Sequence, residues 1–158
     1  MKKLICLLIF LVLASCKSKQ TNSVREPVIP YSKYVIVTVD EVNVIKINRA
    51  YDLGTRLLET CNTSKFKTFS RTEATDKVIQ NATVDKISKT CHKINNRNGR
   101  FIDLQLIEII HNVETDDYQF RYKIDYQKKY FERQLSVIVN SENKVSAIST
   151  KEIAKKPF

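Results

Sequence analysis

The sequence contains very little glycine. Only Gly54 and Gly99 occur among 158 residues, so neither a GxGxxG nor a GxxxxGK phosphate-binding loop is present. This excludes the nucleotide-binding families that depend on such loops. Tryptophan is absent, and proline occurs three times. With 42% hydrophobic and 28% charged residues, the composition is that of a globular protein, and the length fits one domain.

Long hydrophobic runs are also scarce. The apolar run from Leu4 to Leu13 has ten residues, whereas a helix needs about 20 to span a bilayer. Lys2 and Lys3 precede this run, and small residues followed by a polar stretch close it. This order is typical of a signal peptide, which we place at residues 1–15.

The end of this segment, Leu13-Ala14-Ser15-Cys16, resembles the lipobox of bacterial lipoproteins. The resemblance implies that a diacylglyceryl group is attached to the Cys16 sulfur and that the signal is cleaved before this residue. Cysteine is required because the lipid acceptor is a thiolate. The mature chain would then start at Cys16 and be held on a membrane by two or three acyl chains, which is enough for stable anchoring.

The residues after the lipobox indicate which membrane is involved. In lipoproteins of double-membraned bacteria, aspartate after the lipidated cysteine commonly signals retention in the inner membrane, and here Lys17 follows. The acidic stretch that directs some lipoproteins to the cell surface is missing from Lys17-Ser18-Lys19. The resemblance therefore implies an outer-membrane lipoprotein that faces the periplasm.

The segment 16–33 is polar and contains Pro27 and Pro30, which predicts a flexible tether between the lipid and the folded domain. The alternative is an ordered arm whose apolar residues pack on the domain. We place a single folded domain at residues 34–158.

The first half of this domain has helical periodicity. Residues 34–39 are rich in β-branched residues and predict a strand or an extended segment. Apolar residues then recur at steps of three and four from Ile47, which predicts a helix that ends near Cys61 and starts between residues 40 and 48. Thr38 and Glu41 have the spacing of a capping box. A second helical stretch is predicted over residues 72–95, either as one helix or as two pieces separated at 81–84.

The second half has strand periodicity. The strand 101–110 is predicted to place Ile102, Leu104 and Leu106 inward, with Ile107 in a bulge or in a strand that is buried on both faces. Apolar residues alternate without a break over 118–126. Two more strands, 130–139 and 144–149, complete an α+β fold with two or three helices on one face of a curved four-stranded antiparallel sheet.

This order of elements resembles the small cystatin-like or NTF2-like lipoprotein domains of bacteria, over residues 40–150. The resemblance implies that the sheet curls around its helices into a cone. The open end of the cone is then either a ligand pocket or a packed core.

Two cysteines remain in the mature domain. Cys6 leaves with the signal and Cys16 carries lipid, so Cys61 and Cys91 are left on the apolar faces of the two predicted helices. An even number of cysteines in an oxidising compartment predicts a disulfide between them, the alternative being two buried free thiols.

The candidate pocket residues are the side chains that the cone would place inward, namely Tyr51, Tyr122, Tyr126 and His111. Catalysis would also need a buried base, but Asp103 falls on the polar face of its strand. We therefore expect a non-enzymatic protein without a cofactor. We expect no metal site, because the neighbours Cys91 and His92 point in different directions on a helix.

The chain is strongly basic. Lys2 and Lys3 leave with the signal, so the mature chain keeps 25 basic and 17 acidic side chains and a net charge of +8. Basic and aromatic residues are interleaved in 118–133, as on a nucleic-acid platform. Alternation places the tyrosines on one face and Arg121 and Lys123 on the other, so no nucleic acid is expected. The basic face is either simply solvated or attracted to anionic lipid headgroups.

These observations predict a membrane-anchored lipoprotein whose domain binds another envelope protein or a small apolar ligand. The alternatives are a lipid-anchored inhibitor or immunity-type protein that blocks an enzyme and, less favoured, an NTF2-like pocket enzyme. The oligomeric state is left open.

Overall fold

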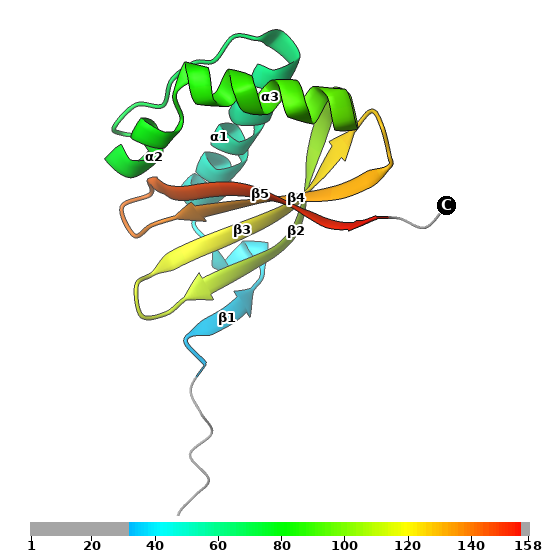
Figure 1. Cartoon of the computed structure of the whole chain (residues 1–158). Helices are drawn as coiled ribbons and strands as arrows, with labels where there is room; N and C mark the ends of the chain where they lie inside the picture. Colours follow the sequence, from blue (N-terminus) through cyan, green and yellow to red (C-terminus); the bar gives the residue numbers. More distant parts are fainter. Residues whose placement is uncertain (1–31, 156–158) are drawn as a thin grey trace, which may run out of the picture. The chain divides into compact units, whose positions relative to one another are not determined.

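The computed structural model describes residues 32–155. The predicted signal peptide, the lipidation site Cys16 and nearly all of the tether lie outside the described residues. The described chain is α+β, with three helices and one five-stranded antiparallel sheet of order β1-β2-β3-β4-β5 (Figure 1). In chain order, the elements are β1 (Tyr34–Val37), the 3-10 turn η1 (Val39–Glu41), α1 (Val44–Thr63), α2 (Asp76–Asn81), α3 (Val84–Asn98), β2 (Phe101–Asn112), β3 (Asp117–Tyr126), β4 (Phe131–Val139) and β5 (Val145–Lys155).

The predicted number of four strands was wrong, because β1 is a fifth strand of the sheet. It pairs antiparallel with the end of β2, from Tyr34 opposite Asn112 to Val37 opposite Ile109. Local propensity predicted an extended segment here. Its place in the sheet depends on partners far along the chain, which no local pattern specifies.

The first long helix starts and ends close to the predicted positions. The Asn43 side chain accepts a hydrogen bond from the Ile45 N–H at 2.8 Å and caps α1. At the other end, Ser64 adopts a left-handed conformation with φ 58°. In the predicted capping box, the Thr38 N–H donates to Glu41 Oε2 at 2.7 Å, but this box starts η1 and not α1.

The second helical stretch is broken at the predicted place. α2 ends at Asn81, Ala82 leaves helical geometry, and Thr83 caps α3 by accepting the Lys86 N–H. Gly99 follows α3 with φ 74°, a backbone conformation that favours glycine.

Strand β3 has the predicted two-residue alternation, with Phe120, Tyr122, Ile124 and Tyr126 buried. Strand β2 departs from its prediction at two positions, because Leu104 is buried but Leu106, also predicted to point inward, is 38% exposed. The predicted irregularity at Ile107 is confirmed as a shift of register between Leu106 and Glu108. A second shift, between Phe101 and Asp103, turns Phe101 inward and leaves Ile102 57% exposed, so the inward placement of Ile102 was wrong.

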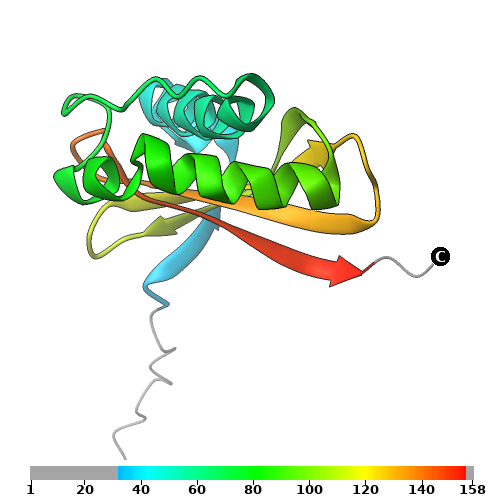
Figure 2. The ribbon, with the colours of Figure 1, turned by 45° about the horizontal axis from the view of Figure 1, so that its top comes forward.

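The helices cover one face of the sheet (Figures 1 and 2). Helix α1 packs across the sheet through Ala50, Leu53 and Leu58, all buried. Gly54 faces the sheet, where an added Cβ would lie 2.6 Å from Leu135 Cδ2. Helix α3 lies beside α1, and Figure 2 shows β5 running next to it. Within residues 32–155, none of the helices combines the length and the apolar composition needed to cross a membrane.

Candidate functional site

Two of the four predicted pocket residues are in contact. The rings of Tyr51, on α1, and Tyr122, on β3, meet edge to face with centroids 6.3 Å apart. The Tyr51 hydroxyl donates to Asp103 Oδ1 at 3.1 Å, and this hydrogen bond raises the pKa of Tyr51. Asp103, which was expected on the polar face of its strand, is thus the hydrogen-bond partner of an exposed tyrosine.

The other two predicted residues lie at opposite ends of the sheet. Tyr126 packs against Phe101 at 6.4 Å, whereas His111 stacks on Tyr118 with ring centroids 4.2 Å apart. Tyr118 and Tyr126 are the two ends of one run on β3, so about 26 Å separate them at 3.3 Å per residue. Tyr51, Tyr122, Tyr126 and His111 therefore do not surround one cavity.

The two inward tyrosines of β3 are unsuited to proton transfer. Their hydroxyl oxygens are buried and have no hydrogen-bond partner within the described part of the chain. Burial raises the pKa of Tyr126 to about 12 and raises that of Tyr122 further. Both phenols stay protonated at neutral pH.

His111 belongs to a cluster that joins three turns of the fold. Its Nε2 lies 2.9 Å from Asp116 Oδ1. Asp116 Oδ2 lies 3.7 Å from the Nζ atom of Lys46, which donates to the Asn140 carbonyl oxygen at 2.7 Å and sits over the Tyr118 ring. The Lys46 side chain is only 8% exposed. The cluster thus ties the first turn of α1 to the β2–β3 and β4–β5 turns, which is a structural role.

Cys61 and Cys91 are joined by a disulfide that links α1 to α3, with their Cα atoms 4.7 Å apart. His92 points away into solvent, where Asn96 pairs with its ring at 3.2 Å. Within residues 32–155, no group of three or more His, Cys, Asp or Glu side chains is placed to hold a metal ion.

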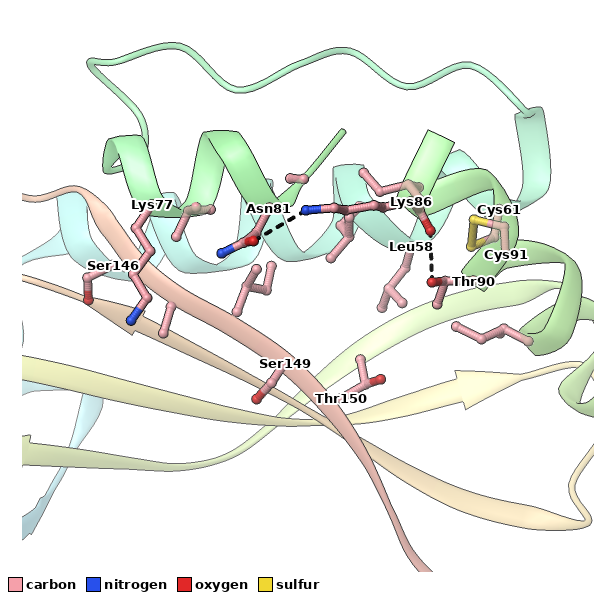
Figure 3. A pocket seen from close by; sticks show the side chains of 17 residues that line it. Leu58, Cys61, Lys77, Asn81, Lys86, Thr90, Cys91, Ser146, Ser149 and Thr150 are labelled. Atoms are coloured by element: carbon pink, nitrogen blue, oxygen red, sulfur yellow. Dashed lines mark hydrogen bonds between the residues drawn. A yellow bond between two sulfur atoms is a disulfide. The ribbon is translucent and has the colours of Figure 1, made fainter. Parts of the chain in front are cut away.

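A cavity of about 340 Å³ lies between the helices and β5, on the side of the disulfide (Figure 3). We call it the α3–β5 cavity. Its lining is mostly apolar, since all three helices turn aliphatic side chains into it. These apolar residues are Leu57, Leu58, Val78, Ala82, Ile87, Ile94, Ala147 and Ile148, together with the disulfide.

Two lysines bring charge to this cavity. In Figure 3, the Lys77 side chain extends from α2 toward β5, and the Lys86 ammonium lies beside Asn81. Among the described residues, Lys86 Nζ contacts only neutral oxygens at long distances, at 3.4 Å to the Gln80 carbonyl oxygen and 3.5 Å to Asn81 Oδ1. No ion pair to Lys77 or Lys86 is formed within residues 32–155. An anionic group can therefore approach either lysine without displacing a carboxylate of the described residues.

Strand β5 supplies five consecutive residues, Ser146 to Thr150, to the cavity wall. Within residues 32–155 it is the last strand of the sheet and its one strand partner is β4, so its second edge carries no further strand beyond a bridge between Ala74 and Val145. The cavity thus combines an apolar surface, two cations and a strand edge.

The sequence pattern had assigned these residues to other roles. Val78, Ala82, Ile87 and Ile94 lie within the helical stretch predicted over residues 72–95, and no local signal indicated that they line a cavity. The strand over residues 144–149 was predicted without an indication that it ends the sheet. No protein-family model, no curated protein and no solved structure matches the chain.

Proposed function

We propose that this protein is a non-enzymatic lipoprotein of the cell envelope that binds a ligand with an apolar part and an anionic part in the α3–β5 cavity. The observation that carries the proposal is the pairing of an apolar cavity with two lysines that have no acidic partner in the described residues. A volume of about 340 Å³ lies at the lower end of the range of small-ligand sites.

The composition of the lining favours binding over acid–base chemistry. Lys77 and Lys86 are the ionisable side chains that line the cavity, apart from the disulfide-bonded cysteines. A hydrolytic or proton-transferring site needs a carboxylate or an imidazole near its substrate, and the described lining supplies neither.

The proposed location is the outer membrane, facing the periplasm, with the acyl chains on Cys16 as the anchor. The support comes from the signal pattern, from the lipobox and from Lys17 after the cysteine. The Cys61–Cys91 disulfide agrees with an oxidising compartment such as the periplasm.

Native mass spectrometry of the lipidated protein, extracted from membranes in mild detergent, tests the binding function. Decanoate serves as the anionic apolar probe and decanol as its uncharged match. We expect decanoate to add to the wild type more strongly than decanol. The Ala82→Trp variant, which fills the cavity, should lose this adduct, and Thr90→Trp offers a second block at an exposed lining position.

Charge variants provide the matched control. Lys77→Glu and Lys86→Glu should weaken decanoate binding, whereas Lys93→Glu, on α3 but outside the lining, should leave it unchanged. Equal binding of decanoate to wild type and to both cavity-filling variants would exclude the cavity as the site. If another protein copurifies equally well with the wild type and with both cavity-filling variants, the result would instead support the alternative of a lipid-anchored inhibitor.

A further inference from the structure

The free edge of β5 already binds one short segment of this chain. The Val145 N–H donates to the Glu73 carbonyl oxygen at 2.9 Å, and the Thr75 N–H donates to the Val145 carbonyl oxygen at 3.0 Å. These two bonds form a parallel bridge between Ala74 and Val145. Residues 73–75 thus occupy the position of a next strand, and the chain then turns away into α2 at Asp76.

The backbone groups that follow on this edge can be identified from the register. The Asn140 N–H donates to the Lys144 carbonyl oxygen, so the backbone N–H and C=O of Asn140 point toward β5. Because backbone groups alternate along a strand, those of Ile138 and Ser136 point to the same side. Ala147 and Ser149, which lie opposite Ile138 and Ser136, therefore form the backbone hydrogen bonds that join β5 to β4.

Since backbone groups alternate along a strand, Ile148 and Thr150 point theirs to the opposite side, toward the cavity. No hydrogen bond between these groups and another segment is formed among residues 32–155. A strand edge with such groups is a template for pairing with another chain.

A strand added at this edge would lie against the apolar surface of the helices. Val78, Ala82 and Ile87 face β5 across the cavity, and successive side chains of a strand point to opposite faces. Every second side chain of an added strand would thus enter the cavity. Lys77 or Lys86 would meet an acidic side chain or a terminal carboxylate of the added strand, because the described lining carries no negative charge of its own.

We propose that the ligand of the α3–β5 cavity is an extended peptide segment of another polypeptide, which adds to β5 as a sixth strand. Its apolar residues occur at alternate positions, and at least one of its groups is a carboxylate. The backbone hydrogen bonds provide affinity, and the cavity and the lysines select the side chains. This inference rests on the proposed function and names its ligand class.

The experiment uses the lipidated protein in nanodiscs and a phage-displayed library of random dodecapeptides, with empty nanodiscs for counter-selection. We expect enriched peptides with alternating apolar residues and a carboxylate. Their affinity is measured by fluorescence anisotropy. Thr150→Pro removes one backbone donor at the free edge while keeping the ladder bonds to β4, and should weaken binding about tenfold.

Two controls distinguish the loss of the Thr150 N–H at the strand edge from the loss of the threonine side chain and from misfolding. Thr150→Val keeps the N–H and the branched shape, so its affinity should stay within about twofold of wild type. In an enriched peptide, either the odd-numbered or the even-numbered backbone amides can be N-methylated. Only methylation of the set that faces β5 should abolish binding, and this test does not depend on whether the Thr150→Pro variant folds. In hydrogen exchange, the amides of Ile148 and Thr150 should gain protection on binding, while those of Ala147 and Ser149 are already paired with β4.

The outcomes distinguish this inference from the proposed function. If decanoate binds in the cavity but no peptide is enriched, the peptide ligand is refuted and the binding function stands. The peptide ligand is also refuted if enriched peptides bind equally well after Thr150→Pro and after N-methylation of either set of amides. If neither decanoate nor any peptide binds, both proposals fail.

Discussion

Arg56 of α1 binds Glu73 through two parallel hydrogen bonds, at 2.7 Å and 3.2 Å. The Glu73 carboxylate also accepts the Ser70 N–H at 2.9 Å and the Ser70 hydroxyl at 3.0 Å. Glu73 therefore closes its own turn and fastens it to the helix. Ala74 and Thr75, the next two residues, form the bridge to Val145. This ion pair therefore fixes the segment that is paired with the first residue of β5.

We expect the Arg56–Glu73 pair to make stability depend on pH. The hydrogen bonds from Arg56 are the main cause that lowers the pKa of Glu73 from 4.5 to about 2. Because the folded pKa lies below the unfolded one, this stabilisation is complete above pH 4.5 and is lost as the pH falls from 4.5 toward 2. Glu73→Gln should cost about 1–2 kcal/mol at neutral pH and almost nothing near pH 2.

Urea unfolding followed by circular dichroism, at several pH values, measures this difference. Glu59→Gln, at an exposed position of α1, is the matched control and should not change stability at either end of the range. If Glu73→Gln lowers the free energy of unfolding by the same amount at every pH, the result would contradict the lowered pKa of Glu73.

The disulfide is expected to contribute strongly to the stability of the domain. It closes a loop with a sequence separation of 30 residues, which in the chain-entropy model corresponds to about 3–4 kcal/mol. The double variant Cys61→Ala/Cys91→Ala should lose this amount in urea unfolding, and reductant should lower the wild type to a similar level. Intact mass should rise by two hydrogen atoms on reduction. An unchanged mass would show that the thiols are free.

Gly54 allows α1 to approach the sheet closely. A methyl group there would meet Leu135 Cδ2 at 2.6 Å and Leu104 Cδ1 at 3.3 Å, and both leucines are buried. Gly54→Ala gains about 1 kcal/mol of helix propensity but overpacks the core at a cost of about 1–3 kcal/mol. We expect a net loss of stability, measured by urea unfolding. Asn48→Ala, exposed on the same helix, should be neutral or slightly stabilising.

Lipidation at Cys16 can be tested without any ligand. Intact mass spectrometry of the membrane-bound wild type should show the loss of residues 1–15 and a gain of acyl mass. Cys16→Ala should abolish both changes. A wild type that keeps its amino terminus, or that appears unlipidated in the soluble fraction, would overturn the lipoprotein assignment and the proposed location with it.

The sequence predicted the elements whose signals are local. The alternation over residues 118–126 specified the buried face of β3, because side chains of a strand point to opposite faces whatever it pairs with. The steps of three and four before Cys61 specified α1, and the break near Ala82 separated α2 from α3. The irregularity at Ile107 was also visible, as one apolar residue too many in an alternating run.

The pairing of distant segments was decided by the tertiary structure alone. Propensity indicated a strand or an extended segment at 34–39, but only contact with residues 109–112 made 34–37 a strand of the sheet. Tyr126 and His111 were both predicted to point inward, and their separation at opposite ends of the sheet depends on register. The free edge of β5 likewise exists because, among residues 32–155, no other strand follows it in space, which is a property of the sheet and not of any single stretch of sequence.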